Sequence, residues 1–296
     1  MLLSSKWMYF LAASVLTGSA QAMAAPVPDF APNPGVSWLM NPNGYQPSGP
    51  GPGPVVADPS HPGVGNDEFR RTGRQVSLPQ ADLGNRILQP WAREILRKRN
   101  DLVLAGKAPS FGIDCGPIGG AAFLVRTPNQ PYYFVQAPDR VIIINQDDHQ
   151  FRHIYMTAAH SSNLKPSWSG ESIGHYEGDE LVVDTIGISA GAPVDRFFTP
   201  HTDKIHMVER FKVLPGGDRL DVRVHVEDPG AFTVPWDARI SYDRVEPGRA
   251  ERKLPPGLNS GATVAGPLVE RSCAENPFSY FGKDSPPVPR ADRSDF

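Results

Sequence analysis

The chain has 296 residues, of which 40% are hydrophobic, so it can bury one sizeable core with appended elements. Its formal net charge of −3 and its isoelectric point near 6.2 argue against the basic face that nucleic-acid binding requires. We therefore expect no nucleic-acid partner.

The N-terminus has the pattern of a secretory signal peptide. Lys6 precedes the apolar run 7–16, and small residues follow at Ala20, Ala22 and Ala24. The apolar run is too short to span a bilayer, which disfavours a membrane anchor. We predict that residues 1–24 form a signal peptide, that cleavage follows Ala22 or Ala24, and that the mature protein is periplasmic or secreted without a stable membrane span.

Residues 25–80 are rich in Pro, Gly, Asn and Ser and are interpreted as a linker. Its one hydrophobic cluster is Trp38, Leu39 and Met40, which we expect to dock on the folded domain. Residues 81–107 are predicted as a helical arm. Within it, Ile87, Trp91, Ile95 and Leu96 recur about every four residues, with Arg and Lys opposite, and Pro90 marks a start or a break.

From Tyr132 onward the hydrophobic period changes to two, which is typical of strands. Eight strands are predicted, over 132–136, 140–145, 150–156, 171–176, 181–186, 204–214, 219–227 and 238–245. Sequential antiparallel strands of this number close into an up-and-down barrel, which removes exposed edges. We therefore predict a mainly β, lipocalin-like or calycin-like barrel over residues 108–250, with a sandwich as the alternative.

The residues 251–296 are again rich in Pro and Gly and are predicted to form an irregular tail. The two cysteines, Cys115 and Cys273, are an even pair in an exported chain, which favours one disulfide that ties the tail to the barrel. Two buried free thiols, or one catalytic thiol, are the alternatives.

The run Trp168–Thr185 reads WSGESIGHYEGDELVVDT. It resembles the signature W-x-G-x-S-x-G-x-[WY]-E-G-D-x-L-V-V-[DE]-T of a large group of mostly uncharacterised exported bacterial proteins. Shorter matches extend from about residue 85 to about residue 275. The resemblance implies a shared architecture and secretion, and no reaction. The chain departs from the group at 157–160, where it has TAAH in place of a T-D-G-R turn.

The sequence GESIG at Gly170–Gly174 also fits the nucleophile elbow of serine hydrolases. That elbow requires a helix directly after the serine, whereas Leu181, Val182 and Val183 predict a strand. Glycines that flank a serine within a strand more often mark close packing. We therefore do not expect Ser172 to be a nucleophile.

Glu209 is the most informative candidate residue. In the strand around it, Ile205, Met207, Phe211 and Val213 share its face, so the alternation points Glu209 into an apolar interior. A buried carboxylate either is paired with an internal Arg or Tyr, or serves as an acid, a base or a ligand-orienting group.

Seven of the eight histidines fall between His149 and His225. We expect His153, His160 and His201 to lie with Glu209 near one mouth of the barrel, where imidazoles suit acid–base chemistry. No pair of histidines has firm metal-ligand spacing, so no metal site is predicted. Catalytic roles are assigned to Glu209, His153 and His201, and ligand-binding roles to Tyr155, Trp168, Arg210, Trp236 and His160.

The leading hypothesis is an exported barrel enzyme that acts on a small apolar or aromatic metabolite by His/Glu acid–base chemistry, without an organic cofactor. Isomerase, lyase, cyclase and hydrolase reactions all fit this description. The alternatives are a non-catalytic binding protein for a hydrophobic small molecule and a structural envelope protein with a filled core.

Overall fold

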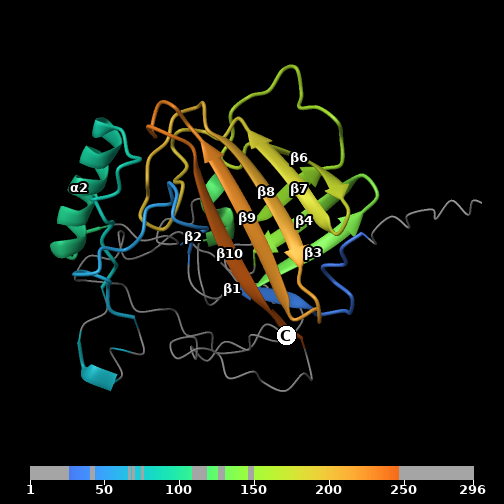
Figure 1. Ribbon diagram of the computed structural model, residues 1–296, viewed down its shortest axis with the longest axis horizontal. Coiled ribbons are helices and arrows are strands. Elements are labelled where there is room, and N and C mark those ends of the chain that lie inside the picture. The colour runs from blue at the N-terminus through green and yellow to red at the C-terminus, as the bar shows by residue number, and fades with distance from the viewer. Residues whose placement is uncertain are drawn as a thin grey trace, which may run out of the picture.

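The computed structural model describes residues 27–40, 44–65, 68, 71–74, 77–108, 119–125, 131–145 and 150–246. The predicted signal peptide, the predicted tail at 251–296, and both Cys115 and Cys273 lie outside these described residues. The described part is mainly β structure, and it also contains the helix α2 (Pro90–Leu104) and the 3-10 helix η1 (Gly120–Val125) (Figure 1).

All eight predicted strands are present, with bounds that differ by a few residues at most. They are β3 (Tyr132–Ala137), β4 (Arg140–Asn145), β5 (Phe151–Tyr155), β6 (Glu171–Glu177), β7 (Glu180–Ile186), β8 (His206–Val213), β9 (Arg219–Glu227) and β10 (Trp236–Val245). Their burial alternates along each strand because successive side chains point to opposite faces. One face forms the core and the other faces solvent.

The barrel is closed by a strand that the sequence analysis placed in a linker. β1 (Ser37–Met40) pairs antiparallel with both β10 and β3, so nine strands form a closed ring, and the short β2 (Gln46–Pro47) adds to β10. All four residues of β1 are buried, and the indole of Trp38 donates to the Phe30 carbonyl at 2.8 Å. The eight-strand count is therefore wrong, and the hydrophobic residues 38–40 are part of the wall.

The prediction of an all-antiparallel barrel is also wrong at one position. β5 and β6 run parallel, with Ile154 opposite Ser172. Parallel neighbours need a connection that returns to the starting end of the sheet, and the residues between Tyr155 and Glu171 supply it. This connection rises above the barrel at the top of Figure 1.

The predicted helical arm contains α2 (Pro90–Leu104), which stands beside the barrel in Figure 1. Pro90 occupies the first turn, where its missing N–H costs nothing. Ala92, Leu96 and Asn100 are buried, whereas Trp91 and Ile95 are exposed, so the packed face is rotated from the predicted one. The Trp91 indole donates to the Gly230 carbonyl at 2.8 Å and ties the helix to the loop after β9.

No helix in the described ranges combines the length and the apolar character that a bilayer span needs.

The barrel core is occupied in part by η1 (Gly120–Val125), all six residues of which are buried. Three tyrosine hydroxyls donate to its carbonyls: Tyr45 to Ala121 at 2.6 Å, Tyr132 to Phe123 at 2.7 Å and Tyr242 to Leu124 at 2.8 Å. These bonds satisfy the backbone of a segment that lacks a full helical ladder. The apolar side chains of η1 are part of the hydrophobic core.

Candidate functional site

Glu209 points into the core, as its alternation predicts, and it is paired there with an arginine. Its side chain is 1% exposed, and that of Arg152 is 2% exposed. Arg152 donates through Nη1 to Glu209 Oε1 at 2.9 Å and through Nη2 to Oε2, which makes a bidentate pair. Burial lowers the pKa of Arg152, but the charge and hydrogen bonds of Glu209 outweigh this effect and raise it. The pair is a sealed structural element.

Ser172 belongs to the same interior network. Its Oγ accepts from Arg152 at 3.3 Å and lies 2.9 Å from Thr185 Oγ1. The residue is 2% exposed and sits within strand β6, with no helix after it. Gly170 has a φ of 69°, and a Cβ there would lie 2.5 Å from the Ile186 carbonyl oxygen, so the first glycine of GESIG permits close packing. The motif is structural.

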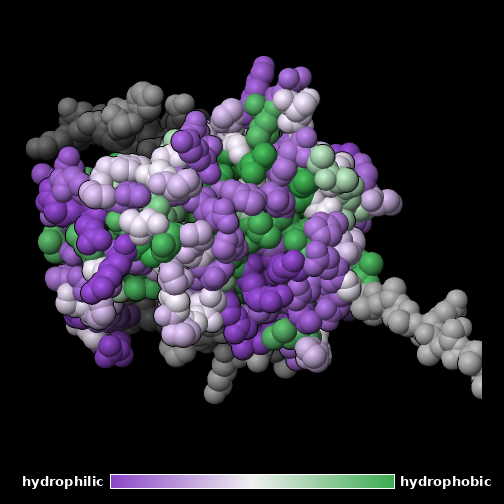
Figure 2. Space-filling view, turned by 45° about the horizontal axis from the view of Figure 1, so that its top comes forward, coloured by the Kyte–Doolittle hydropathy of each residue, from purple (hydrophilic) through white to green (hydrophobic). Residues whose placement is uncertain are grey.

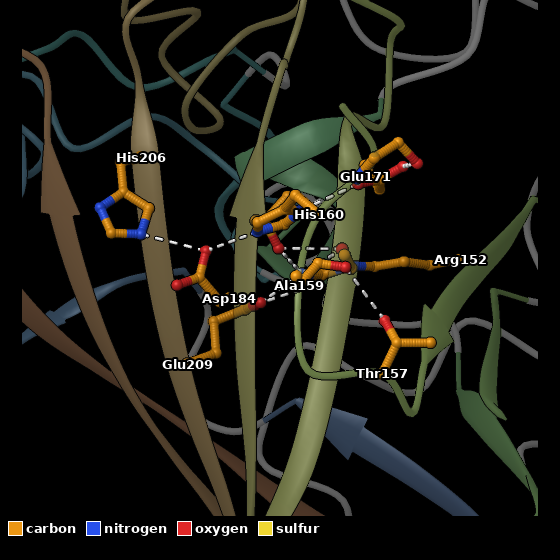
Figure 3. Close-up of polar contacts among 11 residues, drawn as sticks. Arg152, Thr157, Ala159, His160, Glu171, Asp184, His206 and Glu209 are labelled. Atoms are coloured by element: carbon orange, nitrogen blue, oxygen red, sulfur yellow. Dashed lines mark hydrogen bonds and ion pairs between the residues drawn. The ribbon is translucent and has the colours of Figure 1, made fainter. Parts of the chain in front are cut away.

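A second polar cluster lies on the outward faces of β6, β7 and β8. We name Glu171, His160, Asp184 and His206 the rim row, because hydrogen bonds join them in that order (Figure 3). His160 Nδ1 lies 3.0 Å from Glu171 Oε1, and His160 Nε2 lies 3.0 Å from Asp184 Oδ1. His206 Nε2 lies 3.1 Å from the same Asp184 oxygen. One carboxylate oxygen thus bridges two imidazoles.

The fold explains why these four residues meet. Glu171 begins β6, Asp184 lies near the end of β7, and His206 begins β8, so antiparallel pairing places all three at one end of the wall. His160 comes from the connection between β5 and β6, which folds over this end. The parallel pairing of β5 and β6 therefore delivers the central imidazole to the row.

The row is anchored at its Glu171 end. Ser161 donates through its backbone N–H to Glu171 Oε1 at 2.7 Å and through its hydroxyl to Oε2. These hydrogen bonds, and then the contact with His160, lower the pKa of Glu171 and keep it ionised. Since carboxylates only accept hydrogen bonds, His160 faces an acceptor at each of its two ring nitrogens.

The opposite end of the row is open to solvent. His206 Nε2 donates its hydrogen bond to the Asp184 carboxylate. In the neutral ring the proton therefore sits on Nε2, and Nδ1 carries the lone pair. The His206 side chain is 36% exposed, against 17% for His160. Within the described residues, no hydrogen bond involves His206 Nδ1. His206 is thus a partly exposed imidazole whose ring is held in place by a carboxylate.

The row is not arranged as a metal centre. Asp184 lies between the rings of His160 and His206 in Figure 3, so the groups form a line and do not converge on one point. Across the described ranges, no three His, Cys, Asp or Glu side chains are grouped so as to hold a metal ion. The arrangement suits the movement and storage of protons.

Of the residues predicted for the site, only His160 belongs to the rim row. His153 and Tyr155 lie on the solvent side of β5, where their rings stack with centroids 6.2 Å apart, and Trp168 is 43% exposed. The expectation that His153 faces the interior or its mouth is wrong, because the inward residues of β5 are Arg152 and Ile154.

The remaining predicted residues have structural partners. Arg210 faces outward and bonds Glu177 at 2.7 Å. Trp236 is 2% exposed and packs edge-on against Tyr45 and Phe232. His201 is buried and donates through Nδ1 to the Thr202 carbonyl at 2.6 Å. No hydrogen bond or ion pair in the described residues joins His153, His160, His201 and Glu209 to one another. These four residues therefore do not form one hydrogen-bonded cluster.

Sequence reasoning missed Glu171, Asp184 and His206. The strands of Asp184 and His206 are separated by the long segment 187–205, so the register that aligns these two residues is not visible in the sequence. The available signal was the alternation of β8, which already placed His206 on the outer face beside the charged Arg210.

A broad hollow of about 540 Å³ lies elsewhere on the outer wall, and it is lined by six charged or titratable residues: Arg210, Asp221, Arg223, His225, Asp237 and Arg239. Its arginines are already paired, with Glu177, Glu180 and Asp221 respectively, at 2.7 to 2.8 Å. Figure 2 shows hydrophilic residues over most of the visible face and hydrophobic residues in small separate areas. The face visible in Figure 2 therefore suits small polar molecules better than a broad apolar partner.

No protein-family model matches the chain, and no curated protein or solved structure matches it.

Proposed function

We propose that this protein is an exported acid–base enzyme in which the imidazole of His206 is the base. The observation that supports it is the 3.1 Å hydrogen bond from His206 Nε2 to Asp184, in a side chain that is 36% exposed and whose other ring nitrogen has no hydrogen bond among the described residues. A base held by a carboxylate, with a free lone pair at an accessible position, is the arrangement that general-base catalysis needs.

The rim row gives each member a role in this proposal. His206 Nδ1 takes a proton from a substrate carbon, a hydroxyl or a water molecule, and the ring becomes positively charged. Asp184 stabilises that charge across the Nε2–H bond. His160 is a positioning residue, because it fixes the Asp184 oxygen and is itself fixed by Glu171. The same groups return the proton in the second half of the reaction.

The reaction class is proton abstraction or water activation on a small molecule that reaches the barrel wall from solvent, without an organic cofactor. Isomerase, lyase, cyclase and hydrolase activities all use this step. The predicted signal peptide places the reaction in the periplasm or outside the cell. Glu209 is not part of the proposed machinery, because its carboxylate is sealed and paired with Arg152.

The test uses two probe reactions: hydrolysis of p-nitrophenyl esters, and exchange of α-protons of small ketones in D₂O followed by NMR. His206→Asn should reduce the rate by about 10²- to 10⁴-fold, because it removes the proton acceptor. Asp184→Asn should also reduce kcat, since an amide does not stabilise the charged ring.

His175→Asn is the matched control. His175 is an exposed imidazole on the outer side of β6, and it also bonds a carboxylate, Glu177, at 2.8 Å. Its loss should leave both rates unchanged. Equal rates for the wild type and His206→Asn, including an equal absence of turnover, would contradict the proposal.

A further inference from the structure

Arg196 is a charged residue in the loop between β7 and β8. Its side chain is half-buried, yet the guanidinium makes no hydrogen bond and no ion pair with any described residue. The guanidinium carbon lies 5.8 Å from the centroid of the Phe197 ring. Burial lowers the pKa of Arg196. Partial burial of an unpaired cation is unfavourable, so the position calls for an anion.

The neighbouring carboxylate does not provide that anion. Asp195 Oδ1 accepts from the backbone N–H groups of Phe197 at 2.8 Å and Thr199 at 3.2 Å, and Oδ2 accepts from the Thr199 hydroxyl at 2.7 Å. The carboxylate is thus committed to closing its own turn. The negative charge of Asp195 acts to raise the pKa of Arg196, but no ion pair in the described residues joins the two side chains.

Arg196 lines a hollow of about 200 Å³, and Asp195 lines it too, but most of the other walls are apolar. Tyr45, Val55, Val125 and Phe197 are among the lining residues. The Tyr45 hydroxyl already donates to the Ala121 carbonyl at 2.6 Å. Tyr45 therefore contributes mainly its apolar ring to the wall of the hollow. The Arg196 stem runs past Gly44, where an added Cβ would lie 3.4 Å from Arg196 Cδ. The hollow therefore combines the Arg196 cation with mostly apolar walls, the Gln46 amide and the Asp195 carboxylate, whose oxygens are held within its own turn.

We propose that this hollow binds a small organic carboxylate with an apolar body, of about the size of benzoate. The planar guanidinium presents paired N–H donors that match a carboxylate in a bidentate contact. The apolar walls would cover the remainder of the ligand. This site involves none of the rim-row residues, so it stands whether or not His206 is catalytic.

The walls favour a carboxylate over an inorganic phosphate. A phosphate ion presents oxygens in every direction and needs several donors, whereas the lining offers one guanidinium and one amide, beside the Asp195 carboxylate and mostly apolar side chains. A carboxylate places both oxygens on one side and leaves an apolar remainder for the walls.

The test is calorimetric or NMR titration of the folded protein with benzoate, its neutral analogue benzamide, and inorganic phosphate. Benzoate should bind with a Kd near or below about 1 mM, and benzamide and phosphate at least about tenfold more weakly. Arg196→Met should reduce benzoate affinity at least about tenfold, while Arg196→Lys, which keeps the charge without the fork, should give an intermediate loss.

Arg140→Met is the matched control, because Arg140 is an arginine paired with Asp139 at 2.6 Å on the surface. It should leave benzoate binding unchanged. Arg196→Met should unfold at the same or a higher denaturant concentration than the wild type, since no native ion pair is lost. Equal binding of benzoate and benzamide, phosphate binding as tight as that of benzoate, or full benzoate affinity in Arg196→Met or Arg196→Lys would each overturn the proposal.

Discussion

The Arg152–Glu209 pair and the rim row are both built from hydrogen-bonded ionisable side chains, but they differ in exposure to solvent. The pair lies in the core, with both side chains at most 2% exposed. The rim row has similar hydrogen-bond lengths, but its side chains are 17 to 40% exposed. Inside the barrel each charged atom is used by another protein atom, whereas at the rim one imidazole nitrogen is left for solvent.

This difference in exposure implies that the core pair contributes to stability and that the rim row is available for chemistry. A buried carboxylate without its cation carries a large desolvation cost, so Glu209 and Arg152 hold each other in place. An exposed imidazole has no such constraint and exchanges protons with its surroundings. We therefore expect substitutions in the core pair to change mainly the free energy of unfolding, and substitutions in the rim row to change mainly the reaction rate.

The largest expected effect on stability is that of Glu209→Gln. It leaves the buried guanidinium of Arg152 without a countercharge, and we expect a loss of roughly 3–5 kcal/mol in the free energy of unfolding. Urea unfolding followed by tryptophan fluorescence measures this loss. A double variant, Arg152→Met with Glu209→Met, should recover most of it, because neither charge then remains buried.

The control for the core pair is Arg223→Met on the outer wall. Arg223 bonds Glu180 at 2.7 Å, but its side chain is 56% exposed, so the change should be within about 1 kcal/mol. A Glu209→Gln variant that is as stable as Arg223→Met would show that the core pair is dispensable. It would contradict the claim that the buried pair contributes more to stability than the exposed pair.

A smaller effect concerns pH and contrasts a buried with an exposed histidine. Burial lowers the pKa of His201 below its ordinary value of 6.5. The unfolded chain therefore takes up that proton first, and the contribution of His201 to stability is present above about pH 6.5 and is lost as the pH falls toward its folded pKa. Burial also acts to lower the pKa of His225, but hydrogen bonds to Asp237 and Glu227 outweigh it and raise the pKa.

The contribution of His225 is consequently present below about pH 6.5 and is lost as the pH rises through its raised pKa. Unfolding free energies of the wild type, His201→Gln and His225→Gln across this range measure both slopes. The loss of stability on acidification should be smaller in His201→Gln than in the wild type, and larger in His225→Gln. Slopes of the same sign for both residues would contradict the assigned environments.

Much of the barrel could be predicted from the sequence because its strands alternate strictly. The inward residues Leu220, Val222, Val224 and Val226 of β9 are all buried, and Glu209 follows the same rule on β8. Local periodicity determines these features, so no knowledge of distant neighbours was needed.

The partner of Glu209 could not be predicted in this way. On β5, Phe151 and Tyr155 made the His153 face look like the core side, yet Phe151 is 53% exposed and Arg152 is inside. The interior of a barrel wall can accept an arginine only because a carboxylate on a strand 57 positions away supplies the countercharge. Alternation identifies two faces, but it does not say which one is buried.

The closing strand and the rim row depend on long-range pairing. β1 lies in a segment whose Pro and Gly content suggested a linker, and its pairing with β10 joins residues 208 positions apart, Ser37 and Val245. The row likewise needs the parallel β5–β6 pairing and the β7–β8 register. Neither has a local signal in the sequence.

The most direct test of the site is an NMR measurement of the His206 ring in protein labelled with ¹⁵N-histidine, at about pH 8, where the ordinary histidine is neutral. The row predicts that Nε2 carries the proton, that Nδ1 is unprotonated, and that Asp184→Asn weakens this preference. A proton on Nδ1, or the same ring signals in the wild type and Asp184→Asn, would show that Asp184 does not orient His206.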